Sequence, residues 1–103
     1  MNTRPEVPSG FELARTTATF DNRTVPAGLL AAHRVADGVW GRLVVRTGRV
    51  TFVFDDDPDH PIVVDEGNGV AIPPGRAHHL ELTEPATFAV EFYRASPSNH
   101  PRR

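Results

Sequence analysis

Two adjacent histidines, His78 and His79, have side chains that could bind a metal or take part in catalysis. An imidazole binds transition metals, exchanges protons near neutral pH, and both donates and accepts hydrogen bonds. Residues 73–75, two prolines and a glycine, end a short apolar run just before them and predict a sharp bend. On the strand that returns from this bend, His78 shares a face with Leu80, whereas His79 shares the opposite face with Glu81. We therefore expect one imidazole to point inward and its neighbour to point outward.

Short strands must position these side chains. The alternation of apolar and polar residues indicates strands over residues 39–45, 49–54 and 87–93, and a Thr-Gly pair predicts a hairpin turn between the first two. Residues 29–33 lie between two turn signals that are too close together for a stable helix, and they read as a further strand. In all, about eight short strands with turn signals roughly every ten residues predict an all-β fold, either a sandwich or a small antiparallel barrel.

The composition predicts one packed domain. The chain has 103 residues, of which 39% are apolar and 23% are charged. We expect an N-terminal arm over residues 1–10, a β domain over residues 11–94 and a flexible tail over residues 95–103. A domain of this size has a high ratio of surface to volume, which makes a homodimer an expected state.

The charge and the cysteine content exclude several classes of function. A net charge of −2 and an isoelectric point near 6.2 offer no basic surface for nucleic acid or for an anionic membrane. There is no cysteine, no hydrophobic leader and no apolar run long enough to cross a bilayer, so we expect a cytoplasmic protein. No Ser-His-acid arrangement stands out, which disfavours a serine hydrolase.

The residues that lead to His78 follow the spacing G-x5-P-x-G-x2-H. They are Gly67, Pro73, Gly75 and His78. This spacing resembles the second signature motif of the cupin barrels. Other strings resemble the small cupin-like domain of unknown function found in tellurite-resistance-associated proteins, and this resemblance extends over about residues 7–94. The strings are TVPAGLL at residues 24–30, AHR at residues 32–34, GVWGRLVV at residues 38–45 and VEFY at residues 90–93.

This resemblance implies a cupin-type β-barrel or double-sheet jelly roll that binds a divalent metal, a small oxyanion or another small molecule in the barrel mouth, in a stress-response role. His33 is the one nearby histidine that can stand for the family's first motif, so His33 and His78 are the implied metal ligands. Glu91 or Glu81 would be the third ligand, because two imidazoles alone rarely hold a divalent ion. The expected metal is zinc, nickel, iron or manganese.

Arg42 is the predicted counter-charge for a bound anion, provided that its face of the strand points inward. If that face points outward, Arg42 is instead a surface arginine stacked on Trp40. Tyr93 and His79 complete the predicted pocket, and Trp40 and Phe52 are among its apolar walls.

The residues leave three functions open. The first is a metal-associated domain that binds a small molecule or oxyanion. The second is a metal-dependent enzyme of oxygenase or isomerase type, which would need a third convincing ligand and an open coordination position. The third is a metal-free dimeric module that binds through an exposed sheet face. Without a metal, His33 and His78 would be hydrogen-bonded residues that line a pocket.

Overall fold

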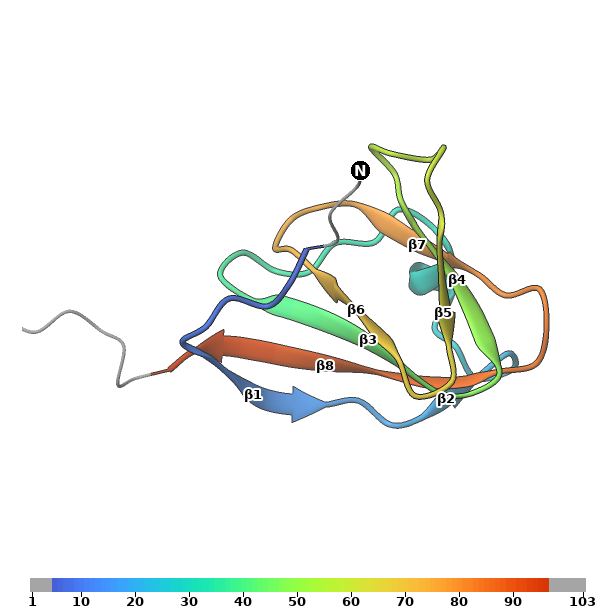
Figure 1. Cartoon of the computed structure of the whole chain (residues 1–103), viewed down its shortest axis with the longest axis horizontal. Coiled ribbons are helices and arrows are strands. Elements are labelled where there is room, and N and C mark those ends of the chain that lie inside the picture. Colours follow the sequence, from blue (N-terminus) through green and yellow to red (C-terminus); the bar gives the residue numbers. More distant parts are fainter. Residues whose placement is uncertain (1–4, 97–103) are drawn as a thin grey trace, which may run out of the picture.

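Two antiparallel β-sheets and one short helix make up residues 5–96, the part of the chain that the structure, a computed structural model, describes (Figure 1). One sheet has the order β1-β8-β3-β6, with β2 also paired to β8, and the other has the order β5-β4-β7. The elements are β1 (Phe11–Thr16), β2 (Phe20–Asp21), η1 (Ala27–Leu30), β3 (Trp40–Thr47), β4 (Arg49–Phe54), β5 (Ile62–Asp65), β6 (Gly69–Ile72), β7 (His78–Glu81) and β8 (Thr87–Ala95). Residues 1–4 of the predicted arm and residues 97–103 of the predicted tail lie outside the described residues. No helix in the described part is long and apolar enough to cross a membrane.

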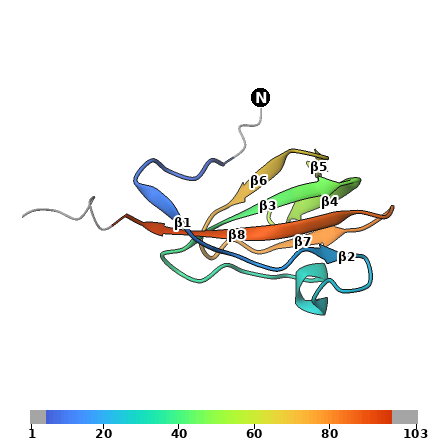
Figure 2. The same cartoon turned by 90° about the horizontal axis from the view of Figure 1, so that it is seen from below.

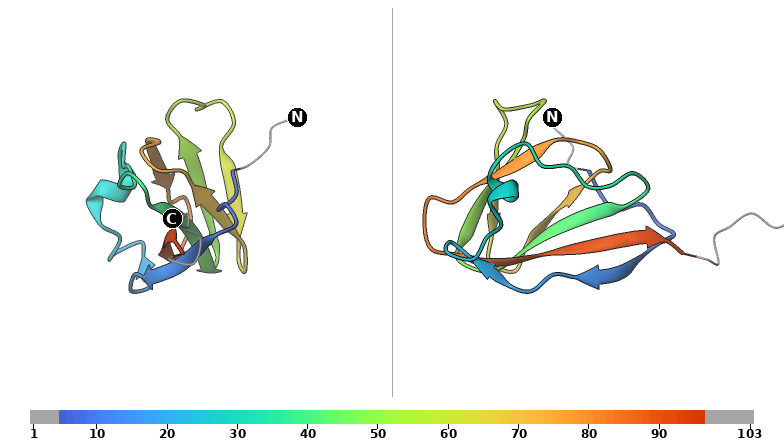
Figure 3. Two further views of the ribbon diagram at one scale, coloured as in Figure 1. Left: turned by 90° about the vertical axis from the view of Figure 1, so that its left-hand side faces the viewer. Right: turned by 180° about the vertical axis from the view of Figure 1, so that it is seen from behind.

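The predicted all-β fold is confirmed, in the form of two separate sheets. Figure 3 shows the two layers from one end and from behind. Within residues 5–96, no strand pairing joins the two sheets into a closed barrel. The layers are held together by apolar side chains, because each sheet turns an apolar face toward the other.

Alternate residues of the strands fill the space between the sheets. The largest fully buried side chains are Phe52, Phe88, Leu43, Val50 and Val64. Each such side chain contributes about 1.5–3 kcal/mol to stability through removal of apolar surface from water. Since Leu43 and Phe88 point inward, the period of two turns their neighbours Arg42 and Thr87 outward.

The turn at Gly48 joins the two sheets and does not close a hairpin. β3 pairs with β6 and β8, whereas β4 pairs with β5 and β7. Gly48 has a φ of 76°, and a Cβ atom there would collide with the carbonyl oxygen of Pro85, so this corner requires glycine. The predicted turn is therefore present, but the predicted pairing of its two strands is wrong. Turn residues specify a bend, and packing decides which strands pair beyond it.

The segment predicted as a strand over residues 29–33 is also different. It begins within the 3-10 helix η1, in which the Leu29 amide donates to the Pro26 carbonyl oxygen at 2.9 Å. Pro26 sets the chain direction at the start of this turn, and Leu29 is buried in the core. Only His33 keeps a strand-like contact, a single bridge to His78. Figure 2 shows η1 in teal at one side of the molecule, near β2.

Candidate functional site

Two histidines from distant segments lie against each other beyond the end of η1. The His33 amide donates to the His78 carbonyl oxygen at 2.8 Å, and the His78 amide donates back to the His33 carbonyl oxygen at 2.9 Å. Their imidazole rings meet edge to face, with centroids 5.4 Å apart and planes at 76°. The backbone bridge thus brings together the two histidines that the sequence predicts as a pair.

His78 is held in one tautomer. The residue is 2% exposed, and its Nδ1 lies 3.1 Å from the Arg76 carbonyl oxygen, which can only accept a hydrogen bond, so Nδ1 carries the proton. The Phe52 ring stacks on the imidazole, with centroids 5.2 Å apart. Burial lowers the pKa of His78, so the imidazole is neutral at physiological pH and its Nε2 offers a lone pair.

His33 carries an unsatisfied nitrogen. Its Nδ1 is buried and has no hydrogen-bond partner within residues 5–96. A buried polar atom without a partner costs about 1–3 kcal/mol, so a native protein that keeps one needs a physical reason for it. The same residue lines an adjacent cavity.

A cavity of about 180 Å³ opens beside the two imidazoles. Its wall is mostly apolar and includes Phe20, Leu29, Val35, Ile72, Val90 and Phe92. The polar side chains that line it within the described chain are His33, His78, Thr17 and Arg15. The Thr17 hydroxyl is already engaged, because it accepts from the Val90 amide and donates to the Ala18 carbonyl. The two histidines and Arg15 are therefore the groups available to a ligand.

Arg15 reaches the cavity from an irregular strand. The pairing register between β1 and β8 shifts between Leu13 and Arg15, and such a β-bulge re-aims the side chains that follow it. The central carbon of the Arg15 guanidinium lies 4.6 Å from the centroid of the Phe92 ring, which is itself part of the cavity wall. Arg15 could not be predicted as a site residue from the sequence, since a bulge interrupts the alternation and leaves no signal in the pattern of residue types.

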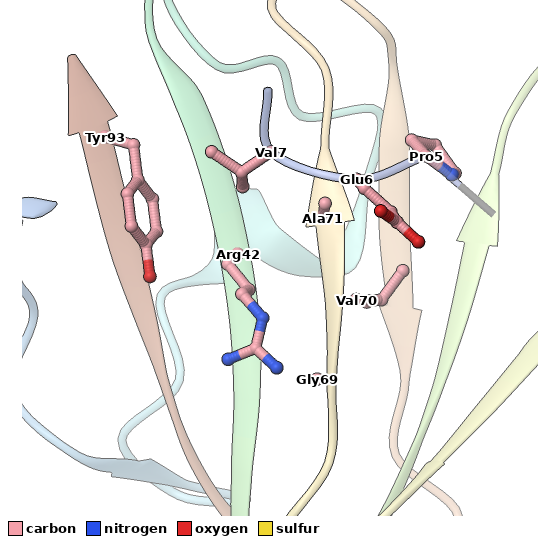
Figure 4. Close-up of a pocket in the computed structure, with 8 residues that line it drawn as sticks. All are labelled: Pro5, Glu6, Val7, Arg42, Gly69, Val70, Ala71 and Tyr93. Atoms are coloured by element: carbon pink, nitrogen blue, oxygen red, sulfur yellow. The ribbon is translucent and has the colours of Figure 1, made fainter. Parts of the chain in front are cut away.

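Four of the predicted site residues lie on the outer face of the larger sheet. They are Trp40, Arg42, Glu91 and Tyr93. Arg42 Nη1 lies 3.6 Å from Glu91 Oε1, and the Tyr93 hydroxyl donates to the same oxygen at 2.7 Å. Figure 4 shows Arg42 and Tyr93 on neighbouring strands, with the guanidinium directed toward Gly69. Arg42 and Tyr93 line a separate cavity of about 400 Å³ on this outer face, together with residues 5–7 and residues 69–71. The prediction that they share one pocket with the histidines is therefore corrected, because apolar neighbours on the same strands occupy the inner face.

His79 and Glu81 also point away from the cavity, as the strand alternation predicts. His79 donates from Nδ1 to Asp55 Oδ1 at 2.7 Å and from Nε2 to Glu81 Oε2 at 3.1 Å. The carboxylates of Asp55 and then Glu81 raise the pKa of His79, because two acceptors favour the doubly protonated imidazolium. This cluster ties β7 to the end of β4 on the outside of the smaller sheet.

The donor set around the cavity does not fit a resident divalent metal. His33 and His78 supply two imidazoles, whereas zinc sites in proteins use three or four protein ligands. The two predicted carboxylate ligands, Glu91 and Glu81, have partners on the outer faces of the sheets. Across the described residues, no three His, Cys, Asp or Glu side chains form a group that could hold a metal ion.

Comparison with known proteins finds relatives in sequence. A sequence model described as the TehB-like domain matches residues 15–90. The chain is also 27% identical over 99 residues to the uncharacterized protein YeaR of Escherichia coli K12, a match that covers 87% of this chain and 83% of YeaR.

Three solved structures share the fold. A protein from E. coli K12 superposes with a TM-score of 0.80 at 27% identity, covering 88% of this chain and 97% of that chain. TehB from Haemophilus influenzae gives a TM-score of 0.75 at 17% identity, covering 84% of this chain but 32% of TehB. A cupin-2 domain containing protein from Shewanella frigidimarina gives 0.54 at 16% identity, covering 99% of this chain and 85% of that chain. The last two likenesses concern the fold alone.

Proposed function

The chain belongs to the TehB-like domain family, as its sequence resemblance predicted, and on this premise we propose that the domain binds a small organic molecule in the cavity beside His33 and His78. A shared fold does not specify an activity, so the proposal rests on the cavity itself. The observation that carries it is the buried, unpaired Nδ1 of His33, on a residue that lines an otherwise mostly apolar cavity.

The volume of the cavity limits the size of the ligand. Pockets for drug-sized ligands usually measure about 300–1,000 Å³, and the present cavity of about 180 Å³ is smaller. An apolar cavity of roughly 150 Å³ is large enough for benzene. The ligand is therefore a molecule of about one aromatic ring or a branched aliphatic group.

The lining of the cavity favours an organic ligand over an inorganic oxyanion. The imidazoles of His33 and His78 are the polar groups on one side of the cavity, whereas most of the remaining wall is apolar. A small inorganic oxyanion such as tellurite carries hydration on every side, and apolar walls would remove that water without replacing its hydrogen bonds. Capture or sensing of a small organic molecule would still be compatible with the predicted stress-response role.

Binding can be tested with two probes of suitable size, benzoate and benzamide. We expect at least one probe to shift the NMR signals of His33 and His78 in a saturable titration. The cavity-filling variant is Gly28→Leu, because a Cβ at Gly28 meets only the His33 ring, 3.8 Å away, and a longer side chain would occupy the cavity. The control variant is His79→Gln, on the outside of the smaller sheet. The proposal fails if neither probe binds, or if Gly28→Leu binds the probes as tightly as the native chain does.

The same samples test the predicted metal. Zinc, nickel, iron and manganese are titrated into the native chain, His33→Ala and His78→Ala, with metal content measured after dialysis. We expect no stoichiometric retention, because the cavity offers two imidazoles and no carboxylate within the described chain. Stoichiometric metal that both variants lose would overturn this expectation and favour the metal-associated functions.

A further inference from the structure

The positive charge of Arg15 beside the cavity indicates the charge of the ligand. We propose that the ligand is a compact organic carboxylate and that Arg15 binds its negative charge. This inference rests on the proposed small-molecule binding at His33 and His78, and it adds the sign of the ligand's charge and the residue that recognises it.

The first support is the charge of the lining. Arg15 lines the cavity and forms no ion pair with any of residues 5–96. Within the same residues, no Asp or Glu side chain lines the cavity. An anion that enters would meet an uncompensated positive charge and no opposing carboxylate, whereas a cation would meet repulsion.

The second support is the contrast with arginines elsewhere on the strands and turns. Arg49 Nε lies 2.8 Å from Asp65 Oδ1, and Arg76 Nη2 lies 2.8 Å from Asp56 Oδ1. Arg42 likewise lies 3.6 Å from a Glu91 oxygen. These three guanidinium groups already have their carboxylates. Arg46 and Arg94 form no ion pair within residues 5–96 either, but Arg15 is the arginine that lines this cavity, so its donors are open to a carboxylate supplied by a ligand.

The third support is the position of the Arg15 guanidinium. The β-bulge after Leu13 places it against the Phe92 ring, 4.6 Å from the centroid. This contact holds a flexible side chain at the cavity mouth without using its N–H donors. A carboxylate bound there would leave the apolar part of the ligand against Phe92 and Val90, which form part of the wall.

The test compares benzoate with benzamide, which have nearly the same shape but differ in charge. Affinities are measured by calorimetric titration for the native chain, Arg15→Met, Arg15→Lys and the control Arg42→Met on the outer face. We expect the native chain to bind benzoate at least tenfold more tightly than benzamide, since hydrogen bonds to charged groups supply about that factor. Arg15→Met should weaken benzoate by about tenfold and leave benzamide unchanged, Arg15→Lys should recover part of the loss, and Arg42→Met should behave as native.

The outcomes separate this inference from the proposed function. If benzamide binds as tightly as benzoate, or if Arg15→Met weakens both probes equally, the carboxylate inference is wrong while small-molecule binding stands. If neither probe binds the native chain, both proposals fail. An amide NMR spectrum of each Arg15 variant that matches the native spectrum outside the cavity shows that a lost affinity does not come from unfolding.

Discussion

Replacing His33 with leucine should stabilise the protein in the absence of ligand. The Nδ1 of His33 is buried without a partner among the described residues, and such an atom costs about 1–3 kcal/mol. Leucine removes that atom and keeps an apolar side chain at the cavity wall. The bridge to His78 survives the change, because backbone atoms form it. Since His33 as a whole is only partly buried, we expect a gain at the lower end of the range, about 1 kcal/mol.

Thermal unfolding measures this change directly. For a domain of about 100 residues, 1 kcal/mol shifts Tm by roughly 4–8 °C, which is well above the error of the method. The matched variant His78→Leu should shift Tm downward, because it leaves the Arg76 carbonyl oxygen without the hydrogen bond from Nδ1. A lower Tm for His33→Leu would refute the reasoning, since it would mean that Nδ1 of His33 contributes to the stability of the free protein.

Three further predictions concern pH and the turns. The carboxylates beside His79 hold its pKa above the ordinary 6.5. The cluster therefore contributes its full stability, about 1 kcal/mol, below pH 6.5, and this contribution is lost as the pH rises through the raised pKa. In a profile of Tm against pH, His79→Gln should remove this loss. Burial lowers the pKa of His78, so the folded protein favours the neutral imidazole. Above pH 6.5 this residue costs no stability, and the free energy of unfolding should fall as the pH drops below that value. A Tm of the His79→Gln variant that stays constant below pH 6.5 would contradict this prediction. Gly67→Ala should lower the free energy of unfolding by about 1–2 kcal/mol, because its φ of 83° alone is unfavourable for alanine. Gly48→Ala should lower it further, because its Cβ also meets the carbonyl oxygen of Pro85. Equal losses for the two variants in urea unfolding would argue against this clash.

The part of the site that β7 contributes could be predicted from the sequence. The prolines and Gly75 predict the bend before β7, and Gly75 has the positive φ of 72° that such a bend favours. The alternation beyond it predicts that His78 is buried and that His79 and Glu81 share the other face, and the structure has this arrangement. His33 entered through family resemblance, because its own segment shows no pattern that marks it.

The predictions that differ from the structure all depend on contacts between segments that are distant in the sequence. Alternation groups Arg42 with Trp40, but it cannot show on which side of the sheet a second layer packs, so it could not show that Arg42 and the two histidines line different cavities. The Thr-Gly turn predicts a bend at Gly48, but the strands on either side of it pair with other partners in different sheets. Arg15 was missed because a single shift in register redirects its side chain.

The sequence by itself determined the local properties of this protein: where the chain bends, which residues alternate, and that short strands would build an all-β domain. These follow from the dihedral angles open to glycine and proline and from the period of two, which depend on neighbouring residues alone. Only the tertiary structure decided that His33 meets His78, that Arg15 closes on Phe92 and that the carboxylates lie outside. Those contacts depend on how two sheets pack to bury the most apolar surface, which is a property of the whole chain.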